Sequence, residues 1–230
     1  MSKTIVVVGF GPGISTAVAE KFGKAGFSVA LVARNADRLA AGVAALKAQG
    51  ITAGAFPADA GDPAAIKAAF EQARSSLGPI GVFHWNAYGG SEGGDLATAE
   101  PVAVKGVFDV AIVGLVAAVQ AALPDLKAAG DGAVLITNGA FGDLTPEMDA
   151  YATGLNFQGL ALANAAKHKL VGLLSERLKG DGVYVGEVTV AGSIKGTAWD
   201  NGDATIAPST VADRFWDLYQ GRGQVRARVS

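Results

Sequence analysis

Short runs of β-branched residues alternate regularly with longer, alanine-rich runs of helical period along this chain. The first run, residues 4–8, is continuously apolar, which is typical of a strand buried on both faces of a sheet. Strand–helix alternation this regular implies parallel strands joined by right-handed crossovers. We therefore expect an α/β fold, a Rossmann-type doubly wound parallel sheet of about seven strands with helices on both faces. The expected strands are residues 4–8, 28–33, 51–56, 80–85, 133–137, 183–190 and 224–229.

The helices between these strands follow from apolar spacing and capping residues. Asp62 followed by Pro63, for example, is an N-cap followed by proline at the first helical position. We find no linker and no internal repeat, so residues 1–230 are expected to form a single domain. The expected helices are residues 13–25, 37–49, 62–77, 103–128, 155–179 and 210–219, with a glycine-rich loop over 89–101 and a second loop over 142–158.

Charge and composition exclude several functions. The 19 Lys and Arg residues against 21 Asp and Glu leave a net charge of −2 without a dense basic stretch, which argues against nucleic acid as a partner. The chain has no Cys, which excludes disulfides, thiolate metal sites and a thiol nucleophile. The two histidines, His84 and His168, lie far apart without carboxylates at ligand spacing, so we expect no metal site.

Targeting and membrane signals are not expected either. The apolar run that begins at Ile5 and ends before Gly9 is too short for a signal peptide with a cleavage site. The longest apolar helical run, residues 110–119, is bounded by Asp109 and Gln120, whereas a membrane span needs about 20 residues. We expect a cytoplasmic protein with a small-molecule substrate and no membrane partner.

Glycine is unusually frequent, and one cluster of it points to a ligand. There are 32 glycines in 230 residues, about twice the average share. The segment Gly9-Phe10-Gly11-Pro12-Gly13-Ile14 lies between the first expected strand and the first expected helix. Small residues there let the backbone approach a pyrophosphate at the helix N-terminus, where free N–H groups and the helix dipole favour anions.

These residues resemble the motifs of the short-chain dehydrogenase/reductase family. In place of its T-G-x-x-x-G-x-G motif the chain keeps Gly9 and Gly13, with Val8 for the Thr and Ser15 for the last Gly. Further segments that resemble the family are residues 57–62, 86–89, 174–178, 183–185 and 191–197. The resemblance implies that a nicotinamide cofactor is bound by Gly9, Phe10, Gly11, Gly13, Ile14, Asp59, Ala60, Asn86, Ala87, Tyr88, Gly192, Ile194 and Thr197.

The end of the second expected strand favours NADP(H) over NAD(H). An NAD site places an acidic residue there to accept the ribose hydroxyls, and Ala33 offers none. Arg34 follows and carries a fork of donors for a 2′-phosphate, unless it is only a solvated surface residue.

The resemblance breaks down at the catalytic residues. In the family a Tyr is the acid/base, a Lys lowers its pKa and holds the ribose, a Ser orients the carbonyl, and an Asn anchors a water relay. Here Ala111 stands at the Asn position and Gly139 at the Ser position. The neighbouring Asn138 can still donate a hydrogen bond to a carbonyl.

No register yields the Tyr-x-x-x-Lys pair. Counting back from residues 174–178 puts Leu160 and Asn164 at the two positions, and a slip of one turn puts Ala163 and Lys167 there. Asn164 and Lys167 are both candidates for the ribose contact. Lys167 also belongs to the run Lys167-His168-Lys169, which is typical of a solvated helix face.

Tyr151 is the remaining candidate for the proton donor. It lies in the expected loop 142–158, which is longer than the usual connection of the family, so it can reach the site or act only as a packing or lid residue. The catalytic candidates are therefore Asn138, Tyr151 and Lys167. An atypical branch of the family also lacks the Tyr, and it shares the longer spacing to Gly192 seen in residues 183–192.

Two functions remain open. The first is an NADP(H)-dependent oxidoreductase with a non-standard active site, acting on a small carbonyl or alcohol, because hydride transfer depends foremost on cofactor orientation. The second is a catalytically inactive NADP(H)-binding protein, a redox sensor or partner subunit, which the degenerate catalytic positions favour.

The two longest expected helices, residues 103–128 and 155–179, are too apolar and alanine-rich to face water on one side. In the family they pair across a two-fold axis, so we predict a homodimer or homotetramer. Light scattering checks this, and a monomeric mass would contradict it.

Overall fold

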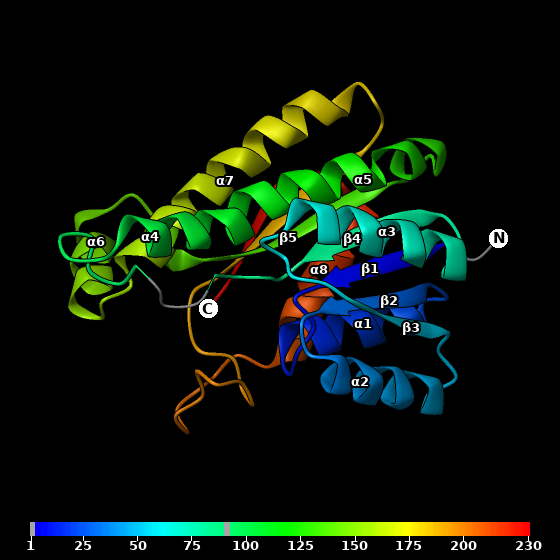
Figure 1. Cartoon of the computed structure of the whole chain (residues 1–230), viewed down its shortest axis with the longest axis horizontal. Coiled ribbons are helices and arrows are strands. Elements are labelled where there is room, and N and C mark those ends of the chain that lie inside the picture. Colours follow the sequence, from blue (N-terminus) through cyan, green and yellow to red (C-terminus); the bar gives the residue numbers. More distant parts are fainter. Residues whose placement is uncertain (1–2, 90–92) are drawn as a thin grey trace.

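The structure is a computed structural model that describes residues 3–89 and 93–230. It contains one parallel sheet of seven strands in the order β3-β2-β1-β4-β5-β6-β7 (Figure 1), which confirms the expected doubly wound fold. Residues 90–92 of the expected loop 89–101 lie outside the described residues. The strands are β1 (Thr4–Val8), β2 (Ser28–Ala33), β3 (Ala53–Pro57), β4 (Ile80–Trp85), β5 (Ala133–Gly139), β6 (Tyr184–Val190) and β7 (Arg226–Val229).

Helices cover both faces of the sheet, so each face has its own apolar core. Figure 1 shows α3, α5 and α7 over one face and α1, α2 and α8 over the other. The first group is α3 (Pro63–Leu77), α4 (Pro101–Phe108) with its continuation α5 (Leu115–Ala128), and α7 (Gln158–Lys179); the second is α1 (Ile14–Lys24), α2 (Ala36–Ala48) and α8 (Pro208–Gly221).

Local sequence signals account for where several helices begin. Asp62 caps α3 as expected, since its Oδ1 accepts hydrogen bonds from the backbone N–H of Ala64 at 2.8 Å and of Ala65 at 3.2 Å. The expected loop 142–158 contains the same combination of a capping residue and a following proline, which the sequence analysis did not use. There Thr145 caps a further helix, α6 (Pro146–Gly154), and Pro146 stands at its first position.

A π-helical segment, Asp109–Gly114, joins α4 to α5 without a break. Gly114 ends this segment against the β3–α3 connection. A Cβ added to Gly114 would lie 1.8 Å from the carbonyl oxygen of Ala60. Only glycine therefore allows the helix to approach the sheet this closely.

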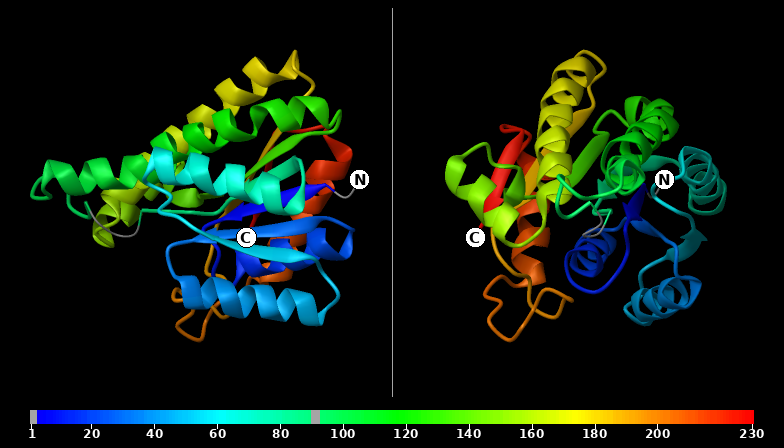
Figure 2. Two further views of the ribbon diagram at one scale, coloured as in Figure 1. Left: turned by 45° about the vertical axis from the view of Figure 1, so that its right-hand side comes forward. Right: turned by 60° about the vertical axis from the view of Figure 1, so that its left-hand side comes forward.

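The continuous helix of 28 residues, Pro101–Ala128, is long and apolar enough by composition to cross a membrane. One side of it belongs to the core of the sheet, where Leu115, Ala118 and Ala122 are fully buried. Its outer side exposes Val102 and Val113, while α7 exposes Leu162 and Leu173. Figure 2 shows these two long helices running side by side past the end of the sheet. The oligomer stays a prediction. The exposed apolar side chains on the outer side of these two helices are where a second subunit would pack.

His84 lies inside the core on β4. Its Nε2 is 2.9 Å from the hydroxyl of Thr137, and its ring packs edge-on against Phe215 with the centroids 4.7 Å apart. Complete burial lowers the pKa of His84 from its usual 6.5 to about 3. The folded protein therefore holds this imidazole neutral, whereas the unfolded chain binds a proton below pH 6.5.

Acid is therefore expected to destabilise the fold through His84. The stability due to its neutral form is complete above pH 6.5 and is lost as the pH falls toward 3, at up to about 1.4 kcal/mol per pH unit. Urea unfolding of the wild type and of His84→Gln at pH 7, 5.5 and 4.5 measures this. We expect a smaller decrease in the free energy of unfolding for the variant. Equal decreases in both proteins would contradict the assignment.

Candidate cofactor and active site

The turn between β1 and α1 has the geometry of a phosphate-binding turn. Gly9 and Gly13 have φ values of +82° and +94°, which residues with a Cβ rarely adopt. A Cβ on Gly9 would also lie 2.5 Å from the backbone nitrogen of Ala87. Gly13 caps α1 without a side-chain hydrogen bond, and the first turn of the helix has no acidic residue. The N-terminal N–H groups of α1 are thus left for an anion.

The loop after β6 packs directly on this turn. Thr197 presents its methyl group to Gly13, where an added Cβ would lie 2.5 Å from Thr197 Cγ2. The hydroxyl of Thr197 donates a 2.8 Å hydrogen bond to the carbonyl of Ile194, which is itself buried and bridged to Ile206. Gly192 is exposed before this bridge. The loop is therefore held in place beside the α1 N-terminus.

The remaining residues expected to bind the cofactor lie at neighbouring strand ends. Asn86 and Ala87 follow β4 and lie against Gly9, while Tyr88 is 52% exposed. Asp59 follows β3 and is exposed, and its Oδ1 accepts a 2.9 Å hydrogen bond from the backbone N–H of Gly61. The structure thus brings the predicted cofactor residues together along the carboxyl edge of β3, β2, β1 and β4.

Two arginines at the start of α2 have no side-chain partner among the described residues. Arg34 and Arg38 are exposed, whereas the other six arginines each make an ion pair or a side-chain hydrogen bond. The side chain of Arg38 lies over the turn between β1 and α1, which we call the glycine turn. A Cβ added to Gly11 would lie 3.7 Å from Arg38 Nη1. The sequence analysis missed Arg38. Its position four residues after Arg34, in the first turn of the helix capped by Asn35, was the available signal.

Ala111, Gly139 and, in the register slipped by one turn, Ala163 stand where the resemblance places catalytic side chains, and all three are small. Ala111 in the π-helical segment and Ala163 on α7 are both buried and belong to one apolar cluster. A Cβ on Gly139 would lie 2.7 Å from Nδ2 of Asn164. The amide of Asn164 therefore occupies the space that a serine side chain would need. The inward face of α7 presents Ala163, Asn164 and Lys167, which belong to both registers.

A polar cluster lies next to these positions around the buried carboxylate of Glu187. We call it the buried polar cluster, after its buried members Asn138, Lys167 and Glu187; the other two members, His168 and Arg226, are exposed. The carboxylate of Glu187 is fully buried and accepts hydrogen bonds from Asn138 Nδ2 at 2.6 Å and from Arg226 Nε at 3.1 Å. His168 Nδ1 lies 3.0 Å from Glu187 Oε2. The sequence analysis missed Glu187, although a lone carboxylate within the apolar run of the sixth strand was a visible signal.

Asn138 has no free N–H group in this arrangement. Its Nδ2 donates to Glu187 and, at 3.0 Å, to the carbonyl of Asn164, while its Oδ1 accepts from the N–H of Gly139. A hydrogen bond from Asn138 to a substrate carbonyl would require one of these bonds to break.

Lys167 is buried, so the alternative of a solvated helix face is wrong for this residue. Its side chain is only 3% exposed, whereas Lys169 is exposed. Its Nζ makes no hydrogen bond or ion pair within the described part of the chain. Burial lowers the pKa of Lys167 from 10.5 to about 8, although the negative charge of Glu187 acts in the opposite direction.

Tyr151 lies apart from the buried polar cluster. It is carried by α6, is 59% exposed, and stacks on Phe141 with ring centroids 5.8 Å apart. Its hydroxyl makes no hydrogen bond with any described residue.

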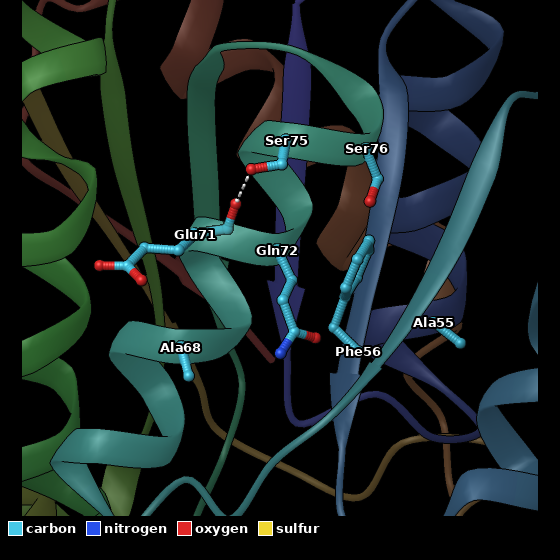
Figure 3. A pocket seen from close by; sticks show the side chains of 7 residues that line it. All are labelled: Ala55, Phe56, Ala68, Glu71, Gln72, Ser75 and Ser76. Carbon is cyan, nitrogen blue, oxygen red and sulfur yellow. Dashed lines mark hydrogen bonds between the residues drawn. The ribbon is translucent and has the colours of Figure 1, made fainter.

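One surface hollow lies away from all of these residues. It has a volume of about 470 Å³ and lies between the edge strand β3 and α3. Figure 3 shows Phe56 from β3 and Gln72 and Ser76 from α3 around it, with Glu71 directed away. None of the predicted site residues lines it; its lining is Ala55, Phe56, Ala68, Glu71, Gln72, Ser75 and Ser76.

Comparison with known proteins decides the family. Residues 3–191 match the family model of the short chain dehydrogenases. The chain belongs to this family. It is 29% identical over 187 residues to 3-dehydrosphinganine reductase TSC10B from Arabidopsis thaliana, which covers 79% of the chain. The chain spans only about half (52%) of the length of that relative.

Solved structures of the family share the whole fold. A metagenomic short-chain oxidoreductase in complex with NADP is 26% identical, with a TM-score of 0.77 over 99% of this chain and 96% of the other. An NADPH-bound short-chain oxidoreductase from Pseudomonas aeruginosa PAO1, described as containing an atypical catalytic center, is 20% identical. Its TM-score is 0.83 over 100% of this chain and 97% of that one.

The unpaired guanidinium groups of Arg34 and Arg38 predict that the protein binds NADPH, which has a 2′-phosphate, more tightly than NADH. We expect Arg34→Ala and Arg38→Ala each to weaken NADPH binding about 10-fold, because each removes charge-assisted hydrogen bonds. NADH binding should change less than about twofold, since NADH has no such phosphate. Dissociation constants from fluorescence titration measure both, with Arg214→Ala on α8 as the control. Equal or tighter binding of NADH by the wild type would contradict the prediction.

Proposed function

We propose that this member of the family is an NADP(H)-dependent oxidoreductase that interconverts a small carbonyl compound and its alcohol. One observation carries the proposal: Lys167 is buried, and its Nζ makes no hydrogen bond or ion pair with any described residue. The charge of Glu187 acts on this ammonium group through space, so its three N–H donors are left for a ligand. The ribose hydroxyls of a bound dinucleotide are acceptors of the right kind.

The other residues predicted to bind the cofactor also fit NADP(H). The glycine turn and the α1 N-terminus would hold the pyrophosphate, and Arg34 and Arg38 would hold the 2′-phosphate. Gly192, Ile194 and Thr197 would lie at the nicotinamide end. NADPH, when bound, supplies the hydride. The solved relatives with NADP or NADPH support this choice of nucleotide.

Within this proposal the residues of the buried polar cluster position Lys167. Asn138 and Arg226 hold the carboxylate of Glu187 in place, and its charge favours the protonated form of Lys167. Tyr151 is the proposed proton donor. It would have to reach the substrate from α6, where its hydroxyl has no other hydrogen bond.

The alternative is an NADP(H)-binding protein without turnover. The observation that favours it is the packing of Ala111, Gly139 and Ala163, because it closes the three positions at which the family places reactive side chains. The groove for the cofactor is the same under both proposals. They differ only in turnover.

NADPH oxidation against a panel of small aldehydes and ketones separates the two. We expect turnover by the wild type with at least one of these compounds. Tyr151→Phe should lower the rate about 10²–10⁴-fold at unchanged affinity for NADPH, because it removes only the proton donor. Tight NADPH binding without any turnover would instead support the inactive binding protein, and full activity of Tyr151→Phe would exclude Tyr151 as the donor.

Lys167→Met tests the ribose contact independently of turnover. We expect it to weaken NADPH binding about 10- to 100-fold, the value of a hydrogen bond to a charged group. Lys169→Met, on the exposed side of the same helix, is the matched control and should change the dissociation constant less than about twofold. Unchanged affinity in Lys167→Met would contradict the proposed contact.

A further inference from the structure

Five aromatic rings from separate segments form a continuous row at the carboxyl edge of the sheet. We call Tyr88, Phe141, Tyr151, Phe157 and Trp199 the aromatic row. Along it the ring centroids are 6.4 Å apart from Tyr88 to Trp199 and 5.4 Å from Trp199 to Phe157. The row continues over 5.5 Å to Phe141 and over 5.8 Å to Tyr151. All four distances are those of interacting aromatic pairs.

The row lies outside both apolar cores of the sheet. None of its five members belongs to the clusters packed on the two faces. Tyr88 is 52% exposed, Tyr151 59% and Trp199 39%. An aromatic ring stabilises a fold when it is buried, so a row of rings left half open to water is expected where another molecule covers it.

The row begins at the proposed cofactor groove. Tyr88 follows Ala87, whose backbone lies against Gly9, and Trp199 follows Thr197, whose methyl group lies against Gly13. Phe141 lies directly before Gly142, whose added Cβ would meet the backbone of Asn164 and Ala165. The rings therefore border the groove from the glycine turn to the positions of the catalytic residues.

The arrangement of the rings suits a flat ring better than an alkyl chain. Phe157 meets Trp199 at 79° and Phe141 at 67°, so each ring offers an edge to the next, whereas Phe141 and Tyr151 are stacked at 18°. A further aromatic ring can continue such a series through offset stacking or edge-to-face contact. An alkyl chain gains only from the area it buries.

We infer that the aromatic row binds the aryl group of the substrate, so that the substrates of this protein are aryl ketones or aryl aldehydes and their alcohols. This inference rests on the proposed oxidoreductase function and specifies its substrate class. The aryl group lies along Trp199 and Phe157, and the carbonyl lies toward the Phe141 end of the row, where Tyr151, the proposed proton donor, stacks on Phe141.

Binding in the presence of NADP⁺ tests the inference without relying on turnover. Calorimetry compares acetophenone with cyclohexyl methyl ketone, its saturated analogue, and with the linear ketone 2-octanone. We expect acetophenone to bind about 3- to 10-fold more tightly than either, which is the typical worth of one aromatic pair. Equal affinities, or tighter binding of the linear ketone, would overturn the inference.

Variants locate the effect on the row. Trp199→Leu and Phe157→Leu keep an apolar side chain but remove the ring, and each should abolish the preference for acetophenone over cyclohexyl methyl ketone. Leu144→Ala is the matched control, because Leu144 is an exposed apolar residue near Phe141 in the chain that contributes no ring. It should keep the preference. A preference retained in both ring variants, with their thermal unfolding unchanged, would overturn the inference.

Direct titration with NADPH distinguishes an incorrect substrate class from failure of the proposed function. Trp199→Leu and Phe157→Leu should bind NADPH within about twofold of the wild type, because neither side chain is among those proposed to hold the nucleotide. A wild type that does not bind NADPH would refute the proposed function and this inference with it. Normal NADPH binding without aryl preference would refute the substrate class alone.

Discussion

The placement of β1 between β2 and β4 determines where this protein can bind a ligand. β1 pairs in parallel with both neighbours, and the strand order runs from it toward β3 on one side and toward β7 on the other. Chain segments leaving β1 and β4 therefore go to opposite faces of the sheet, and in open α/β sheets ligands bind at such a point of divergence. Gly9 lies at this point, where the absence of a side chain lets the backbone of Ala87 approach. The positions of the glycine turn, the loop at Thr197 and the aromatic row all depend on this divergence of the segments that follow β1 and β4.

The expected catalytic positions are packed differently from the turn between β1 and α1. Ala111 and Ala163 belong to one small apolar cluster, and the amide of Asn164 fills the space above Gly139. Behind them, a buried carboxylate is held by an amide, an imidazole and a guanidinium. A buried charge network of this kind adds little net stability, and under the proposed function it serves to position Lys167.

Hydrophobic periodicity was sufficient to predict the sheet and most of the helices. It failed at α6, because that helix is short and weakly amphipathic, and only Thr145 and Pro146 mark its start. The nucleotide half of the site could be predicted because its residues follow in order along the chain. Lys167 and Glu187 could not be joined from the sequence, since their proximity depends on how α7 lies over β6. The same holds for the aromatic row, whose members are separated by up to 111 positions, from Tyr88 to Trp199.

A crystal structure with NADP⁺ bound tests most directly whether Lys167 is kept unpaired for the cofactor. We predict that its Nζ lies within about 3.2 Å of a ribose hydroxyl. Glu187 should remain bonded to Asn138 and Arg226 in that complex. A complex in which Lys167 pairs with Glu187, with the ribose beyond its reach, would contradict the proposed role of Lys167 in holding the cofactor.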